Sequence, residues 1–95
     1  MPAYIIVDIE VTDPTRYEQY KHQAQETVQA FGGRYIVRGG AAEQLEGTWT
    51  PARLVVLEFP DTDAARAWWS SDAYRPARAL RNETARKNMI LVEGT

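Results

Sequence analysis

The chain has 95 residues, of which 44% are hydrophobic and 25% are charged, and its 11 basic and 13 acidic side chains give a formal net charge of −2. These ordinary values predict one globular domain over residues 1–95. The sequence contains no cysteine, which excludes disulfides, thiolate metal sites and a cysteine nucleophile. No apolar run approaches the length of a membrane span, and the first ten residues lack the basic start of a signal peptide. We therefore expect a cytoplasmic protein with no membrane partner.

The first third of the chain predicts a strand followed by an amphipathic helix. Side chains alternate along residues 4–11 so that one face is entirely apolar, which is typical of a strand packed on a core. Asp13 and Pro14 then supply a helix cap and a first helical residue. An apolar stripe recurs at spacings of three and four, at Tyr17, Tyr20, Ala24, Val28 and Phe31, and the glycine pair at 32–33 ends the helix.

Three more strands and a helical region follow. Residues 34–38 and 53–59 predict short strands, and residues 89–92 predict the last one. Before that last strand, Asp61 caps a short alanine-rich helix and Ser71 begins a second one. The order β-α-β-β-α-β predicts an α+β, ferredoxin-like fold, in which helices cover one face of a single antiparallel sheet.

The sheet face without helices decides which partners the protein can have. It is expected to carry four aliphatic and two acidic side chains: Ile6, Ile36, Leu54, Val56, Asp8 and Glu58. The aliphatic side chains are too many to leave in water on a monomer, so we expect a homodimer formed through the open faces. An RNA-recognition domain shares this element order but stacks bases on aromatic side chains of its sheet. Because this face is aliphatic and acidic, we expect no nucleic-acid partner.

The strongest candidate site lies around the connection between the second and third strands. Residues 40–52 form a longer connection than a hairpin needs, and long ordered loops in small domains are often functional. The connection carries Glu46 and Trp49, and Arg38 and Arg53 flank it. We expect these four residues near the mouth of a pocket between the connection and the open sheet face. Two guanidinium groups and one indole favour a small, planar, anionic ligand.

Two carboxylates, Asp8 and Glu58, are expected deeper in that pocket, where either could accept a proton from a substrate. The predicted strand register places Arg34 opposite Glu58 and Arg38 opposite Leu54, all on the open face. An alternative stays open: the pair Arg34–Glu58 could be a buried ion pair that fixes the strand register or the dimer.

Tyr74 is a further candidate for contact with a substrate. It lies four residues before Arg78 and seven before Arg81, so all three can share one flank of a helix. Such a cluster can polarise a bound carbonyl, and it is also a common pairing on helix surfaces. The only histidine, His22, is predicted to point to solvent, so we expect no cofactor and no metal site.

Four blocks of the sequence resemble one known family. They are VTDPTRYEQY, GGRYIVRGG, LEGTWTPARLVVLEFPD and AWWSSDAYRPARALR, which together reach over nearly the whole chain. They are similar to the family catalogued as domain of unknown function 1330, in the dimeric α/β-barrel superfamily. The resemblance implies a ferredoxin-like protomer whose open sheet face packs against a second subunit to close a barrel. It implies no activity, because the superfamily includes cofactor-free monooxygenases, isomerases and haem-degrading enzymes.

Two functions follow from the sequence as competing hypotheses. The first is a small-molecule-binding protein or cofactor-independent enzyme that acts on a small organic or aromatic acid in a barrel pocket. The second is a non-catalytic dimeric module with a structural or regulatory role. A ligand beside Arg38 and Trp49 would favour the first hypothesis, and a barrel filled with side chains would favour the second.

Overall fold

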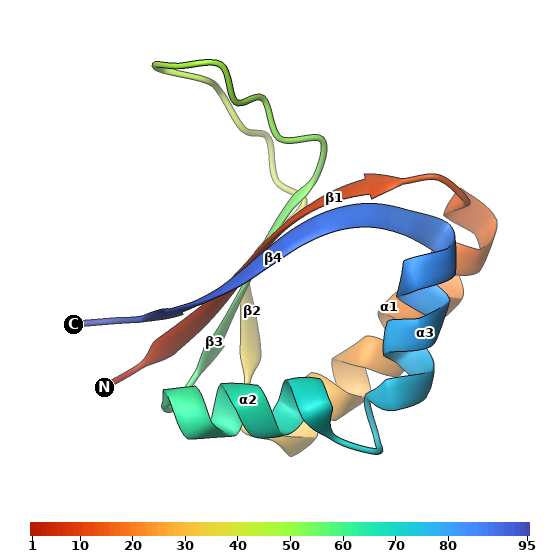
Figure 1. The fold of residues 1–95 in the computed structure, drawn as a ribbon, viewed down its shortest axis with the longest axis vertical. Helices are drawn as coiled ribbons and strands as arrows, with labels where there is room; N and C mark the ends of the chain where they lie inside the picture. The colour runs from red at the N-terminus through yellow and green to blue at the C-terminus, as the bar shows by residue number, and fades with distance from the viewer.

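A computed structural model describes residues 1–95, which form four strands and three helices. The elements are β1 (Ala3–Val11), α1 (Pro14–Ala30), β2 (Arg34–Arg38), β3 (Leu54–Phe59), α2 (Thr62–Ser70), α3 (Arg75–Thr84) and β4 (Ala85–Glu93). The strands form one antiparallel sheet in the order β2-β3-β1-β4. All the helices lie on one side of this sheet (Figure 1). The predicted α+β, ferredoxin-like fold is confirmed, and none of the helices is both long and apolar enough to span a membrane.

The core lies between the sheet and the helices. Every second side chain of β1 points into it, and Ile5, Val7 and Ile9 are at most 3% exposed. Phe59 of β3 and Trp68 of α2 are almost completely buried, and their ring centroids lie 5.5 Å apart. The alternation of apolar side chains predicted from the sequence therefore determines which face of the sheet is buried.

The last strand begins earlier than the sequence predicts. It starts at Ala85, directly after α3, instead of at Met89. The end of α3 is held beside the start of α1, because Thr12 N donates a hydrogen bond to Thr84 O over 2.8 Å. Polar residues 86–88 hide the strand pattern in the sequence, but β4 is an edge strand, and edge strands tolerate exposed charges.

A bulge at Ile36 changes the register of β2 after its first two residues. Val37 rather than Ile36 lies opposite Val56, and Arg38 consequently lies opposite Val55. An extra residue in a strand turns every later side chain to the other face. The prediction that Arg38 lies on the open face is therefore wrong, and its side chain lies on the helix side of the sheet.

Arg34 and Glu58 are cross-strand neighbours, as predicted. Arg34 Nε donates a hydrogen bond to Glu58 Oε1 over 2.9 Å, but the Arg34 side chain is 70% exposed. Because exposed ion pairs contribute little, we expect Glu58→Ala to lower the free energy of unfolding of the separate protomer by less than about 1 kcal/mol in urea denaturation. A loss of several kcal/mol would instead show that a second subunit covers the pair.

The connection between β2 and β3 (residues 39–53) leaves the body of the protein as an extended arm (Figure 1). Its internal hydrogen bonds are short-range, such as the one from Gln44 Nε2 to Gly47 O over 2.7 Å. Leu45, near the tip, is 85% exposed. The arm is therefore held at its base rather than packed along its length.

Candidate functional site

Asp8 anchors the arm on the open face of the sheet. Its Oδ2 accepts a hydrogen bond from Trp49 Nε1 over 2.9 Å, and its Oδ1 accepts one from Ala52 N over 3.2 Å. Trp49 nevertheless stays 59% exposed, and Glu46 is exposed as well. Both oxygens of Asp8 are thus engaged with the arm.

A polar hollow of about 220 Å³ lies beside this anchor. Its lining residues are Asp8, Glu10, Thr50, Ala52, Arg86, Lys87 and Asn88. The two acidic and two basic side chains of the lining give it no net formal charge, and Arg86 Nη1 lies 3.7 Å from Glu10 Oε1. None of Arg38, Arg53 and Glu58 lines this hollow, so the single pocket predicted from the sequence is divided between different parts of the protein. Nowhere do three His, Cys, Asp or Glu side chains gather as a metal site would require.

Arg38 and Arg53 lie on the helix side, at the exposed end of a narrow slit between α1 and the sheet. The slit has a volume of about 20 Å³, and its lining includes three tyrosines, Tyr17, Tyr20 and Tyr35. The Arg38 guanidinium lies 4.2 Å from the centroid of the Tyr35 ring. The Arg53 guanidinium packs against Gly39, where a β-carbon would collide with Nη1.

Tyr74 lies farther inside, in a chain of buried polar groups. Its hydroxyl oxygen lies 2.9 Å from that of Tyr20, and Arg81 Nη1 donates a hydrogen bond to it over 2.9 Å. The predicted proximity of Tyr74 to Arg81 is confirmed, but inside the protein instead of on a helix flank. Arg78 turns away from both and places its guanidinium 4.5 Å from the centroid of the Trp69 ring.

Burial keeps the tyrosines in and around this chain of buried polar groups protonated. It raises the pKa of Tyr35 to about 12 and the pKa of Tyr20 well above its ordinary value. Burial also raises the pKa values of Tyr17 and Tyr74, although the positive charge of Arg81 opposes the effect at Tyr74. At neutral pH all four phenols are uncharged, so each can donate a proton in a hydrogen bond.

Arg81 is a buried cation without a counter-ion. It is 3% exposed, takes part in none of the salt bridges, and its Nε has no hydrogen-bond partner. Besides Tyr74, its guanidinium meets only Asn82 Oδ1 at 3.5 Å and Met89 Sδ at 4.0 Å. A buried, unpaired charge is costly by several kcal/mol. This position therefore favours binding of an anion.

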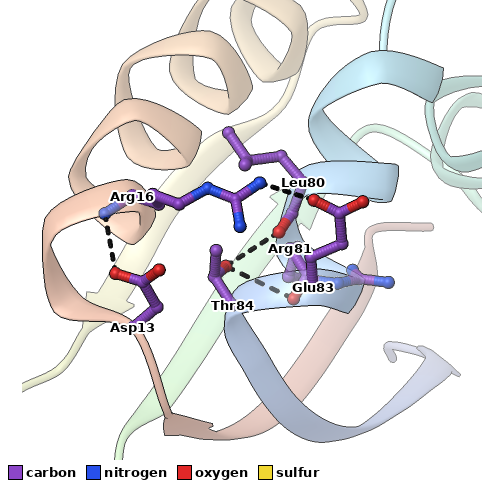
Figure 2. A network of polar contacts seen from close by, with 6 residues as sticks. All are labelled: Asp13, Arg16, Leu80, Arg81, Glu83 and Thr84. Atoms are coloured by element: carbon purple, nitrogen blue, oxygen red, sulfur yellow. Dashed lines mark hydrogen bonds and ion pairs between the residues drawn. The ribbon is translucent and has the colours of Figure 1, made fainter.

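The end of α3 that bears this arginine is tied to the start of α1 (Figure 2). Asp13 Oδ1 accepts a hydrogen bond from Arg16 N over 3.2 Å, and the guanidinium of Arg16 forms a salt bridge with Glu83. Thr84 Oγ1 donates to Leu80 O over 2.8 Å, which closes the last helical turn. These contacts fix the backbone from which the buried guanidinium extends.

Arg81 also lines a groove of about 670 Å³ between α2 and β4. The other residues of the groove are Ile5, Ala65, Arg66, Trp69, Ser70, Lys87, Met89, Ile90 and Leu91. The slit and the groove share Met89 as a lining residue. Of the slit, the polar hollow and the groove, only the groove has Arg81 in its lining.

Sequence reasoning named Arg81 only as a neighbour of Tyr74 on a helix flank, and it did not select Tyr17 or Tyr20 as site residues. Both tyrosines were assigned to the apolar stripe of the first helix, and their rings do lie in the core. A signal for Arg81 exists in the sequence, because it lies four residues after Ala77 and three before Thr84, which are both buried on α3. A charged residue at helical spacing between buried positions indicates an inward-facing charge.

Comparison with protein families gives one match. The model described as "Domain of unknown function (DUF1330)" matches residues 2–95, nearly the full chain. None of the curated proteins matches.

Solved structures with the same fold come from several bacteria. A protein of unknown function from Rhodopseudomonas palustris has a TM-score of 0.79 at 16% identity, with 99% of this chain and 82% of that chain covered. SnoaB, a cofactor-independent oxygenase from Streptomyces nogalater, has a TM-score of 0.69 at 12% identity, with 99% and 93% covered. A dimeric ferredoxin-like protein of unknown function from Jannaschia sp. CCS1 has a TM-score of 0.66 at 14% identity, with 99% and 100% covered. At these identities the likeness shows a shared fold.

Proposed function

This chain belongs to the DUF1330 family, and we propose that it is a small-molecule-binding protein or cofactor-independent enzyme that acts on a small organic or aromatic acid. The observation that carries the proposal is Arg81, a buried guanidinium without a counter-ion that lines an open groove. A bound carboxylate would supply the missing negative charge through charge-assisted hydrogen bonds. The fold shared with SnoaB, a cofactor-independent oxygenase, supports this class of chemistry.

The buried polar chain gives each group a role in this proposal. Arg81 holds the carboxylate. Tyr74 lines neither the groove nor the slit, and it supports Arg81 by accepting a hydrogen bond from Nη1 while its hydroxyl also contacts that of Tyr20. Arg38 and Arg53 add positive potential at the exposed end of the slit.

The other residues selected from the sequence take supporting roles in the proposal. Asp8 anchors the arm, and Glu58 fixes the strand register through Arg34. Neither carboxylate lines the groove, so the proposal gives neither of them a part in proton transfer there. Glu46 and Trp49 stay with the arm on the open side of the sheet.

Titration of the protein with benzoate and with pyruvate, followed by tryptophan fluorescence, tests the proposal. We expect saturable binding at millimolar concentration or below, and a loss of at least tenfold in affinity in Arg81→Met. Methionine has a similar volume and no charge, and replacing a buried charge by an apolar group is often neutral or stabilising. Arg81→Met should therefore unfold at the same urea concentration as the parent or a higher one while losing the acid.

Arg38→Met is the matched control, because it removes the same charge at the exposed end of the slit. It should weaken binding by a smaller factor than Arg81→Met does. Two results would refute the proposal: neither acid binds the parent at millimolar concentration, or Arg81→Met binds both acids as tightly as the parent.

We also propose that two protomers pair through their open sheet faces and close a barrel. The face is apolar and exposed on the protomer, where Ile36 is 43%, Val37 37%, Ile90 56% and Val92 38% exposed. The dimeric protein from Jannaschia supports this arrangement. A non-catalytic dimeric module is the second candidate function, favoured by this face alone, and it becomes the better description if no acid binds.

A further inference from the structure

We infer that the acid bound by this protein is amphipathic, with its carboxylate at Arg81 and an elongated apolar body along the groove between α2 and β4. The inference rests on the proposed function, because it takes Arg81 as the carboxylate anchor. It adds the size and shape of the ligand, which the anchor by itself does not specify.

The floor of the groove is an apolar track that starts beside the anchor. Lys87, Met89 and Leu91 share the helix side of β4, since alternate residues of a strand face the same way. Arg81 meets this floor at Met89, where Nη1 lies 4.0 Å from Sδ. Toward Leu91 the floor continues without a polar side chain and is joined by Ile5. Met89 and Leu91 are two residues apart, about 7 Å along the strand, which is longer than a carboxylate group.

The wall of the groove is an indole held in a fixed orientation. Trp69 is 44% exposed although it is a large apolar side chain on a helix. Arg78 holds it from the outer side, with its guanidinium 4.5 Å from the ring centroid and Nη1 donating to Trp69 O over 3.0 Å. Ala65, one helical turn before Trp69, leaves space beside the ring. An oriented and half-exposed indole next to an apolar floor is a surface for a chain or ring.

Charge restricts the ligand to an anion. The ten lining residues include Arg66, Arg81 and Lys87 and no acid. Arg66 Nη1 lies 3.7 Å from Oδ1 of Asp63, a residue that does not line the groove. Arg81 and Lys87 form no salt bridge. A neutral apolar ligand would leave both cations unpaired, and a small acid would leave most of the apolar groove in water. The volume of about 670 Å³ lies within the usual range for small-molecule sites.

A series of straight-chain carboxylates from acetate to octanoate, measured by isothermal titration calorimetry below micelle-forming concentrations, tests the inference. We expect affinity to rise by about threefold to fourfold for each added methylene group that enters the groove. Octanol should bind at least tenfold more weakly than octanoate, because it lacks the charge that Arg81 needs.

Trp69→Ala removes the wall and should flatten the dependence on chain length, with acetate affected least. Trp49→Ala is the matched control, since it removes another exposed indole on the arm and should leave the dependence unchanged. If acetate binds as tightly as octanoate, the inference is wrong and the proposed function stands. If no carboxylate binds, both are wrong. If octanol binds as tightly as octanoate, the assignment of Arg81 as the anchor fails.

Discussion

Val56→Asp is expected to convert the proposed homodimer into a folded monomer. Val56 lies near the centre of the open sheet face, paired with Ile6 on one side and Val37 on the other. An obligate dimer buries at least about 1,200 Å² in total, and an uncompensated carboxylate in such an interface costs several kcal/mol per subunit. Size-exclusion chromatography with light scattering at micromolar concentration should give twice the protomer mass for the parent and the protomer mass for the variant.

Ala79→Asp is the matched control for this experiment. It adds the same carboxylate at an exposed position of α3, on the helix side of the protein. This variant should remain dimeric, and circular dichroism should show that both variants are folded. A monomeric parent, or a Val56→Asp variant that stays dimeric, would rule out association through the open faces.

Raising the pH above 10 is expected to destabilise the protein strongly, and Tyr35 should account for a measurable share. Its pKa is raised by burial to about 12, whereas an unfolded tyrosine ionises near 10. Between these values the folded state binds more protons than the unfolded state, so stability falls as pH rises. The stabilisation is complete below pH 10 and is lost as the pH passes about 12, and it amounts to roughly 3 kcal/mol for Tyr35.

Urea denaturation of the parent and of Tyr35→Phe at several pH values between 7 and 12 measures this effect. Phenylalanine keeps the ring and removes the ionisable group, so the two proteins should differ little at pH 7. The parent should then lose about 2–3 kcal/mol more than the variant by pH 12. Parallel curves for the two proteins would mean that Tyr35 ionises as easily in the folded state as in the unfolded state.

The order of the elements and the caps of the first two helices were predictable because local chemistry determines them, whereas α3 begins at Arg75 instead of at the predicted Ser71 and has no side-chain cap. Asp13 and Asp61 cap their helices in the structure through hydrogen bonds to Arg16 N and Ala64 N. Alternation along β1 identified its buried face correctly. The edge strand β4 was the least predictable element, because polar residues 86–88 are tolerated at a sheet edge and carry no alternating pattern.

The candidate site was only partly predictable. Arg38 and Arg53 were selected because they flank the connection, but a bulge of one residue moved Arg38 to the opposite face. Nothing in the local sequence marks this bulge, since Ile36 and Val37 are both good strand residues. A one-residue shift reverses every side chain that follows, so strand register is the step at which sequence reasoning about this site failed.

Side-chain periodicity and neighbours along the chain are enough to predict the fold class, the caps of the first two helices, the Arg34–Glu58 pairing and the apolar open face. Tertiary packing, in contrast, buries Tyr74 and Arg81 together and leaves Arg81 at a groove without a counter-ion. Tyr20 and Tyr74 are 54 residues apart in sequence, and their contact depends on the packing of α1 against α3. Burial of a charge depends on which distant elements cover it, and no local pattern encodes that arrangement.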